Sequence, residues 1–185
     1  MGAMAYGFNF VGRAFLAADA SELARLLREL RNTVQPMTPL ASQLERMDRA
    51  LTAAAAAELK SEHARLFLDP MNAPCPPWQS AYSDEPQPLG PSHRSALAWF
   101  RAVGIEPKNA DQPADHAGLL MAFYGTLVEA GAGPDIRAAF YEEHLAWMTQ
   151  FFDRVIAEAR HEFYRALAEA AAGLLAQARP SRATT

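Results

Sequence analysis

The sequence predicts an all-α protein, a single-domain helical bundle of about seven to nine helices. Apolar residues recur at every third or fourth position over most of the 185 residues, which is the spacing of one face of an α-helix. No stretch alternates apolar and polar residues with β-branched side chains, and valine and isoleucine are scarce, which argues against strands. Short links between the helical stretches favour an antiparallel bundle.

In the N-terminal part, four helical stretches precede a proline-rich loop. The first covers Tyr6 to Ala18, and the second follows Ser21, a favourable N-cap residue. Residues 40–51 carry a stripe of leucine and methionine at helical spacing, and residues 52–67 continue with five consecutive alanines. Thr52 either caps a new helix or lies within a continuous one, and the pattern fits both.

In the C-terminal part, four further helices follow the loop. Ser92 is the expected N-cap of a helix that ends at Gly104, because glycine is the usual residue just beyond a helix C-terminus. Pro113 is placed to open the next helix. Two apolar-striped stretches, 136–159 and 161–178, complete the bundle.

The whole chain, residues 1–185, is expected to form one domain with its core in about residues 6–178 and a frayed tail at 179–185. The formal net charge is −4, so a basic footprint for nucleic acid, such as a helical transcriptional regulator would carry, is not supported. No apolar run approaches the ~20 residues of a membrane span. No positive residue precedes the apolar stretch from Phe8 to Ala18, which makes it a poor signal peptide. We therefore expect a cytoplasmic protein without stable membrane insertion.

The loop from Asp69 to Pro91 holds seven of the thirteen prolines. Loops of this length inside a compact domain are usually functional or disordered. Trp78 and Tyr82 argue against disorder, because disordered segments are poor in aromatic residues. Proline fixes φ and removes backbone donors, so the sequence predicts an ordered, stiff segment that holds two aromatic rings against the helical body.

Cys75 is the only cysteine. It excludes an internal disulfide and a cysteine-rich zinc site. Two prolines flank it, with no basic neighbour to lower its pKa, so we expect an unreactive thiol.

Metal and nucleotide motifs are weak or missing. A di-iron bundle needs two Glu-x-x-His motifs, and the chain has one, Glu158 to His161. The adjacent pairs Asp115-His116 and Glu143-His144 are expected to point to different helix faces, and neither glycine-rich phosphate fingerprint occurs. A helical metal-binding protein or enzyme that uses His/Glu pairs is retained as the alternative reading.

Several residues have both a structural and a functional interpretation. In the first turn of a helix opened by Pro113, Asp115 would meet the positive end of the helix dipole; otherwise Asp115 and His116 line a pocket. Glu143-His144 fits a partly exposed helix face. Trp78 either anchors the loop to the core or is a binding hot spot for a partner.

Several short motifs occur in a specific order over residues 8–178: Glu62-His63-Ala64-Arg65-Leu66-Phe67, Pro-Pro-Trp-Gln-Ser-Ala-Tyr at 76–82, Gln112-Pro113-Ala114-Asp115-His116, His144-Leu145 near Trp147, and Phe163-Tyr164. This order resembles the TorD/DmsD/NarJ family of redox-enzyme maturation proteins, and the TorD/DmsD branch in particular. Two positions depart from the family pattern. His63 stands for a tyrosine, and Gln112 stands for a glutamate, which lowers the negative charge of the expected groove by one.

The resemblance implies an all-helical cytoplasmic chaperone, without catalysis or a cofactor. It implies binding of the twin-arginine signal peptide, and of the apo-form, of a molybdopterin-containing oxidoreductase before export. A monomer or a domain-swapped dimer fits the long hinge at the loop. By similarity, the peptide site comprises Trp78, Ser80, Tyr82, Asp115, His116 and His144.

Overall fold

The computed structural model describes residues 2–33, 39–51, 56–69, 72–106 and 112–180. The fold is all-α, as predicted. Within these residues the α-helices are α1 (Ala3–Leu16), α2 (Ala20–Thr33), α3 (Pro39–Ala50), α4 (Ala56–His63), α5 (Pro91–Ala102), α6 (Ala117–Glu129), α7 (Pro134–Phe140), α8 (Met148–Glu158) and α9 (Glu162–Ala178). Two π-helical turns, Ala64–Leu68 and Tyr141–Leu145, and a short 3₁₀ turn, Gln79–Tyr82, join them.

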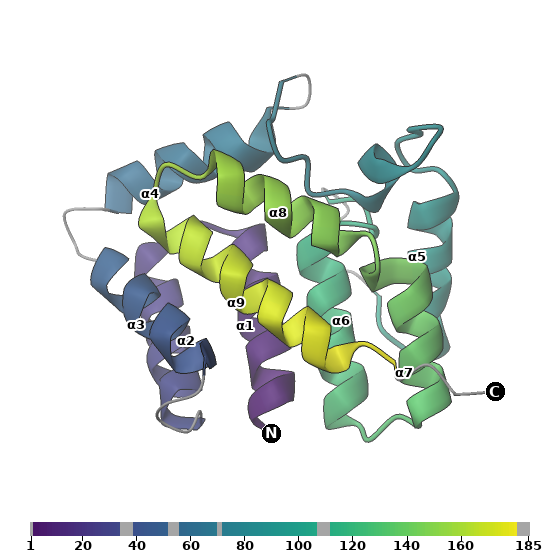
Figure 1. Ribbon diagram of the computed structural model, residues 1–185. Helices are drawn as coiled ribbons and strands as arrows, with labels where there is room; N and C mark the ends of the chain where they lie inside the picture. Colours follow the sequence, from purple (N-terminus) through teal and green to yellow (C-terminus); the bar gives the residue numbers. More distant parts are fainter. Residues whose placement is uncertain (1, 34–38, 52–55, 70–71, 107–111, 181–185) are drawn as a thin grey trace.

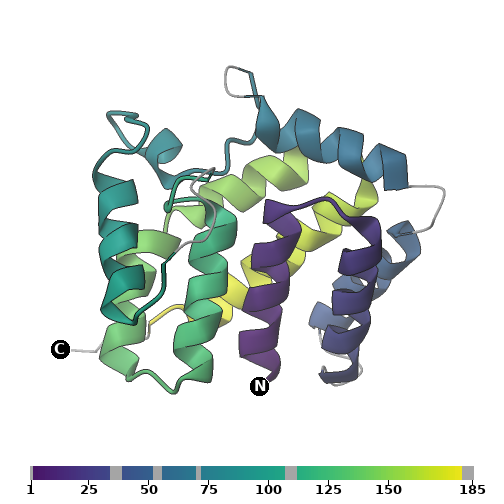
Figure 2. The same ribbon diagram turned by 180° about the vertical axis from the view of Figure 1, so that it is seen from behind.

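The centre of the bundle is the tightly packed pair α1 and α6, with α9 crossing α1 and packing on α3 and α8 (Figures 1 and 2). Glycine makes the close approach possible. A Cβ atom on Gly12 would lie 2.6 Å from the backbone oxygen of Gly118, and one on Gly118 would lie 2.6 Å from that of Gly12. These two positions therefore set the distance between α1 and α6.

Aromatic side chains fill the core between these helices. The Phe15 ring lies 5.6 Å from that of Phe67, 5.2 Å from Phe151 and 5.9 Å from Phe152. All four are buried, so residues far apart in the sequence meet in one apolar cluster. Burial of aromatic surface of this size is a dominant source of stability.

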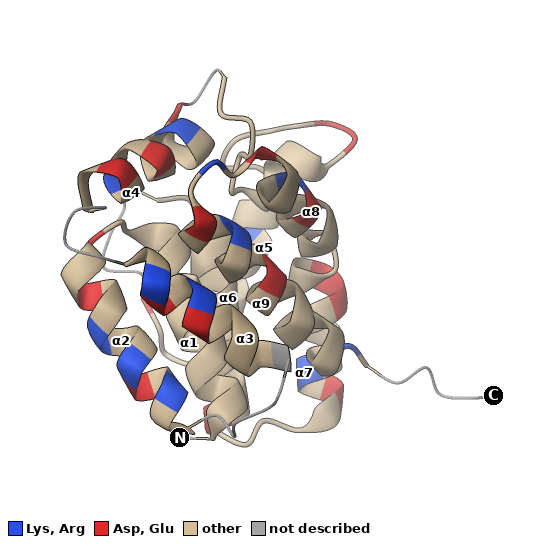
Figure 3. Cartoon of the chain, turned by 60° about the vertical axis from the view of Figure 1, so that its left-hand side comes forward, with Lys and Arg blue, Asp and Glu red and all other residues tan. Residues whose placement is uncertain are grey.

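The exposed helix faces carry charges of both signs (Figure 3). Along α2, Arg25 pairs with Glu29 at 2.7 Å, and Arg46 of α3 pairs with Glu162 of α9 at 2.6 Å. In the part of the chain that the structure describes, the helices are too short or too polar to cross a bilayer.

The predicted stop at Gly104 is confirmed. Gly104 has φ of +74°, and its N–H donates to the Arg101 oxygen at 3.0 Å, while Ile105 N–H donates to the Phe100 oxygen at 2.9 Å. This is the hydrogen-bond pattern of a Schellman cap, in which glycine adopts the left-handed conformation without a Cβ penalty.

The two predicted serine N-caps are wrong. At α2, Asp19 accepts hydrogen bonds from the N–H groups of Ser21 and Glu22 at 2.9 and 3.0 Å, so Ser21 lies within the first turn. At α5, Gly90 is the cap and Pro91 is the first helical residue, one position before Ser92. In both places a neighbouring residue suits the helix start as well as the serine does.

The helix predicted to open at Pro113 begins later, at Ala117. His116 is its N-cap, and the imidazole Nδ1 accepts a hydrogen bond from Gly118 N–H at 3.0 Å. Asp115 therefore lies before the helix, not in its first turn. The stretch 136–159 is likewise divided by the π-helical turn after α7.

Three expectations fall on parts of the chain outside the described residues. These are the structure around Thr52, the backbone at Pro70, and residues 181–185 of the expected tail. The last helix agrees with the predicted range 161–178, with His161 as its N-cap.

Candidate functional site

The residues Pro77–Tyr82, here called the strap, lie against the start of α6. Trp78 and His116 form an isolated antiparallel β-bridge. Ala117 N–H donates to the Pro77 oxygen at 2.7 Å, and Gln79 N–H donates to the Asp115 oxygen at 3.0 Å. The strap part of the proline-rich loop therefore lies against the helical body, as predicted, and backbone pairing to a helix start holds it there.

Asp115 holds the strap from below. Its side chain is fully buried, and Oδ2 accepts a hydrogen bond from Ser80 N–H at 2.9 Å. The other carboxylate oxygen, Oδ1, has no hydrogen-bond partner in the described protein. Asp115 thus accepts a hydrogen bond from the strap backbone. The interpretation that its carboxylate lies in the first turn of a helix opened by Pro113 is therefore wrong.

Gln79 links the strap to the π-helical turn Tyr141–Leu145. Its amide nitrogen donates to the Glu143 backbone oxygen at 2.7 Å, so its oxygen faces His144 Nδ1 at 2.9 Å. Because an amide oxygen only accepts hydrogen bonds, Nδ1 must carry the proton. In the neutral imidazole, His144 Nε2 is then an acceptor.

His144 is fully buried, so the prediction that it lies on a partly exposed face is wrong. Burial lowers the pKa of its imidazole, although the nearby carboxylates of Glu143 and Asp115 act in the opposite direction. Its Nε2 lies 3.6 Å from Glu143 Oε1. The adjacent pair is therefore in contact, contrary to the expectation from ordinary helix geometry. The wider π turn changes the angle between successive side chains.

Glu143 connects this turn to α5. Trp99 Nε1 donates to Glu143 Oε2 at 2.9 Å, and the Ser95 hydroxyl donates to Oε1. The Ser95 hydrogen bond, reinforced by Trp99, lowers the pKa of the Glu143 carboxyl despite its partial burial. The strap, the π turn and α5 thus form one polar network through Gln79 and Glu143.

The other end of the strap is held by aromatic contacts. The Tyr82 ring lies 4.9 Å from that of Trp147, and the Arg154 guanidinium lies 5.3 Å from the Tyr82 ring centre. A cation over an aromatic face is attracted by the ring quadrupole. Burial raises the pKa of the Tyr82 phenol.

His116 is almost fully buried, at 2% exposure. Burial lowers the pKa of its imidazole to about 3, so the ring is neutral and its Nδ1 is available to cap α6. The Trp78 ring lies edge-on to His116 at 6.3 Å. His116 therefore supports both the strap and the helix start.

An apolar pocket of about 410 Å³ opens beside the strap. Its walls include Trp78, Ser80, Pro76, Pro86 and Pro88, and the carboxylate-bearing Asp69 is also part of the lining. Binding sites for small or extended ligands are concave and mostly apolar, with a few polar groups that fix orientation. The pocket suits an apolar side chain with a cationic neighbour.

The structure brings all six predicted site residues together around the strap. Some of them line the pocket, and others are buried beneath the strap. Trp78 and Ser80 line the pocket. The third strap residue, Tyr82, is half-buried, while Asp115, His116 and His144 are buried beneath the strap.

Sequence reasoning missed three residues of the network: Gln79, Ser95 and Trp99. The sequence could have indicated Gln79, because this residue lies inside the Pro-Pro-Trp-Gln-Ser motif. Ser95 and Trp99 lie 48 and 44 positions from Glu143 in the sequence. No local sequence pattern indicates that they contact it.

Cys75 is fully buried, and burial raises its thiol pKa to about 12, which is consistent with the prediction of an unreactive thiol. Among the residues that the structure describes, no three His, Cys, Asp or Glu side chains gather in a way that would hold a metal ion.

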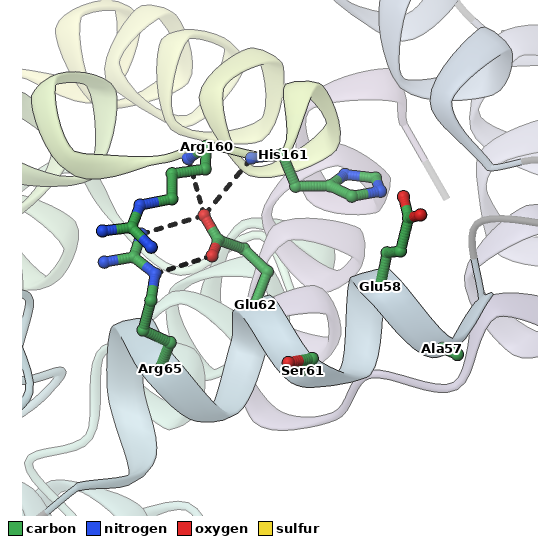
Figure 4. A pocket seen from close by; sticks show the side chains of 7 residues that line it. All are labelled: Ala57, Glu58, Ser61, Glu62, Arg65, Arg160 and His161. Carbon is green, nitrogen blue, oxygen red and sulfur yellow. Dashed lines mark hydrogen bonds and ion pairs between the residues drawn. The ribbon is translucent and has the colours of Figure 1, made fainter.

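A second pocket, of about 470 Å³, lies between α4 and the junction of α8 with α9 (Figure 4). Glu62, buried at 7% exposure, accepts hydrogen bonds from the Arg65 guanidinium at 2.7 and 3.0 Å and from the Arg160 and His161 N–H groups at 2.6 and 3.2 Å. Its carboxylate thus clamps α4 to the start of α9, and its hydrogen-bonding capacity is largely used by the fold.

The family model described as "Nitrate reductase delta subunit" matches residues 16–165. The chain belongs to this family. The match includes the strap, the π turn and all six predicted site residues, and it confirms the family resemblance indicated by the motif order.

Curated relatives of this chain are named for a function. A Tat proofreading chaperone DmsD from Salmonella paratyphi A is 34% identical over 115 residues, which is 61% of this chain and 56% of that protein. The DmsD of Salmonella typhimurium is 33% identical over the same shares. The matched region thus spans just over half the length of these relatives.

A solved structure shares the fold. A protein from Archaeoglobus fulgidus that is named for redox enzyme maturation superposes with a TM-score of 0.67 over 95% of this chain and 96% of that one, at 18% identity. At this identity the likeness establishes the helical fold alone, for nearly the whole chain.

Proposed function

We propose that this protein is a cytoplasmic chaperone that binds the twin-arginine signal peptide of a molybdopterin-containing oxidoreductase. In this role it assists cofactor insertion and folding of the enzyme before export. The observation that carries the proposal is the apolar pocket of about 410 Å³ beside the strap, with the Asp115 carboxylate buried next to it. The chaperone names of the Salmonella relatives support the same role.

The chemistry of the site matches that of the peptide. A twin-arginine signal has a basic segment followed by an apolar one. Trp78 and the prolines of the pocket can bury apolar side chains, each Å² of apolar area contributing ~25 cal/mol before ordering costs. A carboxylate can bind a guanidinium by charge-assisted hydrogen bonds, and the net charge of −4 favours approach of a basic peptide.

The proposal is one of binding without catalysis and without a cofactor of the protein's own. The partners are the signal peptide and the apo-form of the client enzyme, and residues 1–185 act as one domain, as a monomer or a domain-swapped dimer. The alternative, a metal-binding protein that uses His/Glu pairs, gains no support from the part of the chain that the structure describes, where the side chains of His144 and His161 form hydrogen bonds of the fold.

Calorimetric titration with signal peptides of molybdoenzymes from the same source tests the proposal. We expect one peptide to bind with a dissociation constant of about 1 μM or tighter. A matched peptide with Arg-Arg changed to Ala-Ala or Lys-Lys should bind at least tenfold more weakly. Equal binding of the matched peptides, or no binding to any peptide, would contradict the proposed recognition.

A further inference from the structure

One half-buried arginine differs from the others in its surroundings. Among the residues that the structure describes, four arginine side chains are half-buried: Arg46, Arg65, Arg137 and Arg165. Three of them, Arg46, Arg65 and Arg165, donate to a carboxylate or to a backbone oxygen at 2.6 or 2.7 Å. Arg137 has no hydrogen bond or ion pair, and its Nε is buried without a partner. A charged group that leaves water is costly unless it is paired, so an unpaired one requires an explanation.

Arg137 lines a pocket of about 410 Å³ that is separate from the one beside the strap. The start of α1, the second half of α6, α7 and the end of α9 form its walls, and Figure 1 shows the end of α9 reaching α7 there. The strap contacts the opposite end of α6, at Ala117. Part of the wall is apolar and consists of Met4, Pro134, Ala138 and Pro180.

Tyr124 supplies a second donor to the same pocket. Its hydroxyl donates to the Ala178 oxygen at 3.5 Å, which is well beyond the usual 2.5–3.0 Å of an O–H···O hydrogen bond. Burial raises the pKa of the Tyr124 phenol, so the hydroxyl keeps its proton at neutral pH. The pocket therefore holds two donors, Arg137 and Tyr124, whose hydrogen-bonding capacity the fold leaves unused.

The charges of the pocket indicate what kind of anion it suits. Its lining has one guanidinium, that of Arg137, and one carboxylate, that of the exposed Asp135, which forms no ion pair with Arg137 in the structure. A single guanidinium matches a carboxylate, which accepts two parallel hydrogen bonds from it. A phosphate dianion beside Asp135 would need further positive charge. The apolar part of the wall suits a hydrocarbon stem, as in most ligand pockets.

We propose that this pocket is a carboxylate-binding site, in which Arg137 and Tyr124 hold the carboxylate and the apolar wall holds a short aliphatic stem. The carboxylate belongs to a free aliphatic acid or to the end of a peptide chain. The site goes beyond the proposed signal-peptide function, because the two pockets share no lining residue.

Magnetic resonance of the arginine Nε–Hε groups tests binding directly. The signal of Arg137 is the one that disappears in Arg137→Gln. Butyrate should shift this signal with a dissociation constant of about 1 mM, as expected for a ligand of so few atoms. Butyramide, which has the same shape but no charge, should not shift it. The absence of a saturable shift with butyrate, or equal shifts with both probes, would overturn the proposal.

Three further probes identify the source and the chemistry of the anion. N-acetylvaline should bind more tightly than N-acetylvalinamide, because only the former carries a carboxylate. Tighter binding of N-acetylvaline than of butyrate assigns the site to a chain end, and binding that is no tighter assigns it to a free acid. Inorganic phosphate should bind more weakly than butyrate, and tighter binding of phosphate would contradict the assignment to a carboxylate.

Variants test the two donors, with backbone amide signals of α7 as the readout. Arg137→Gln should weaken butyrate binding by at least about tenfold. Tyr124→Phe keeps the buried ring and should weaken it by about fivefold, for the loss of one hydrogen bond. Arg94→Gln is the control, because Arg94 is exposed on α5, and should bind like wild type. If folded Arg137→Gln and Tyr124→Phe both bind like this control, the site is wrong.

Stability without ligand separates a binding role of Arg137 from a structural one. Arg137→Met leaves no partner unpaired, so its midpoint of urea unfolding should equal or exceed that of wild type. Arg65→Met is the comparison, because it removes the partner of the buried Glu62 carboxylate and should lower the midpoint. A decrease in Arg137→Met as large as that in Arg65→Met would show that Arg137 serves the fold and would overturn the proposal.

Discussion

Ser80 N–H donates a hydrogen bond to Asp115 Oδ2 at 2.9 Å, between residues 35 positions apart. This contact joins the middle of a proline-rich segment to the turn that precedes α6. It places Trp78 and Ser80 at the wall of the apolar pocket. The position of the candidate site therefore depends on a carboxylate that is fully buried.

Removal of that carboxylate should destabilise the protein. Asp115→Ala leaves the Ser80 N–H without its acceptor, so the free energy of unfolding should fall by about 1–3 kcal/mol. Asp115→Asn retains an acceptor oxygen and should restore part of the loss. Urea unfolding measures both, with Asp84→Ala, an exposed change in the same loop, as the control. A loss in Asp84→Ala as large as that in Asp115→Ala would contradict the assignment.

Trp78→Ala should weaken binding of the signal peptide by about tenfold or more, because tryptophans in such pockets are frequent hot spots. Calorimetric titration gives the affinity, and circular dichroism gives the helical content. If the loss of binding follows a loss of helicity, Trp78 is a structural plug of the loop and not a peptide contact.

Glu62→Gln should remove part of the acid sensitivity of the fold. Burial by itself raises the pKa of the Glu62 carboxyl, but the hydrogen bonds from Arg65 and from two backbone N–H groups together hold it below the usual 4.5. A lowered pKa in the folded state stabilises the protein above pH 4.5, and this contribution is lost as the pH falls through the folded-state value.

The measurement for Glu62 is the free energy of unfolding between pH 3 and pH 7. Glu62→Gln should be less stable than wild type at pH 7, and the difference should shrink toward pH 3. Glu58→Gln, an exposed change on the same helix, should leave the profile unchanged. A constant difference across the range would show that the charge of Glu62 plays no part in the clamp.

Buried histidine should add a second pH dependence. The His116 pKa is about 3 in the fold and 6.5 as the ordinary value, so the unfolded chain binds the extra proton between these two pH values. Stability should therefore fall as the pH decreases from about 6.5, by up to ~1.4 kcal/mol per pH unit from this group.

His116→Asn isolates this contribution, because asparagine is a good N-cap but has no proton to gain. The variant should lose less stability than wild type between pH 6.5 and pH 5 in urea unfolding. The reverse order, with the variant more acid-sensitive, would mean that His116 is charged in the folded protein.

Glycine at the α1–α6 contact should resist substitution. Gly12→Ala brings a Cβ atom to 2.6 Å from the Gly118 oxygen, which forces the helices apart and should cost about 1–3 kcal/mol of unfolding free energy. Gly173 in α9 is the matched control, because a Cβ there meets nothing within 4 Å. Gly173→Ala should stabilise the protein by about 0.5–1 kcal/mol. Thermal unfolding distinguishes the two, and equal shifts would contradict the close-packing argument.

Local signals in the sequence determined much of this protein. The apolar spacing of three and four residues gives the helices, because that pattern follows from the backbone geometry of a single element. Gly104 likewise predicts a helix end from local sequence, because the left-handed conformation at this position depends on a single residue. The order of the short motifs gives the family, which the match over residues 16–165 confirms.

Tertiary structure decided what local signals leave open. Asp19 and Gly90, in place of Ser21 and Ser92, begin their helices because neighbouring residues compete for one cap position. The roles of Asp115 and His144 depend on where the strap docks, which is a contact between residues 35 and 65 positions apart. A periodic pattern records which face of a helix is buried, but not which distant backbone group that face will meet, because packing of the whole chain selects the partner.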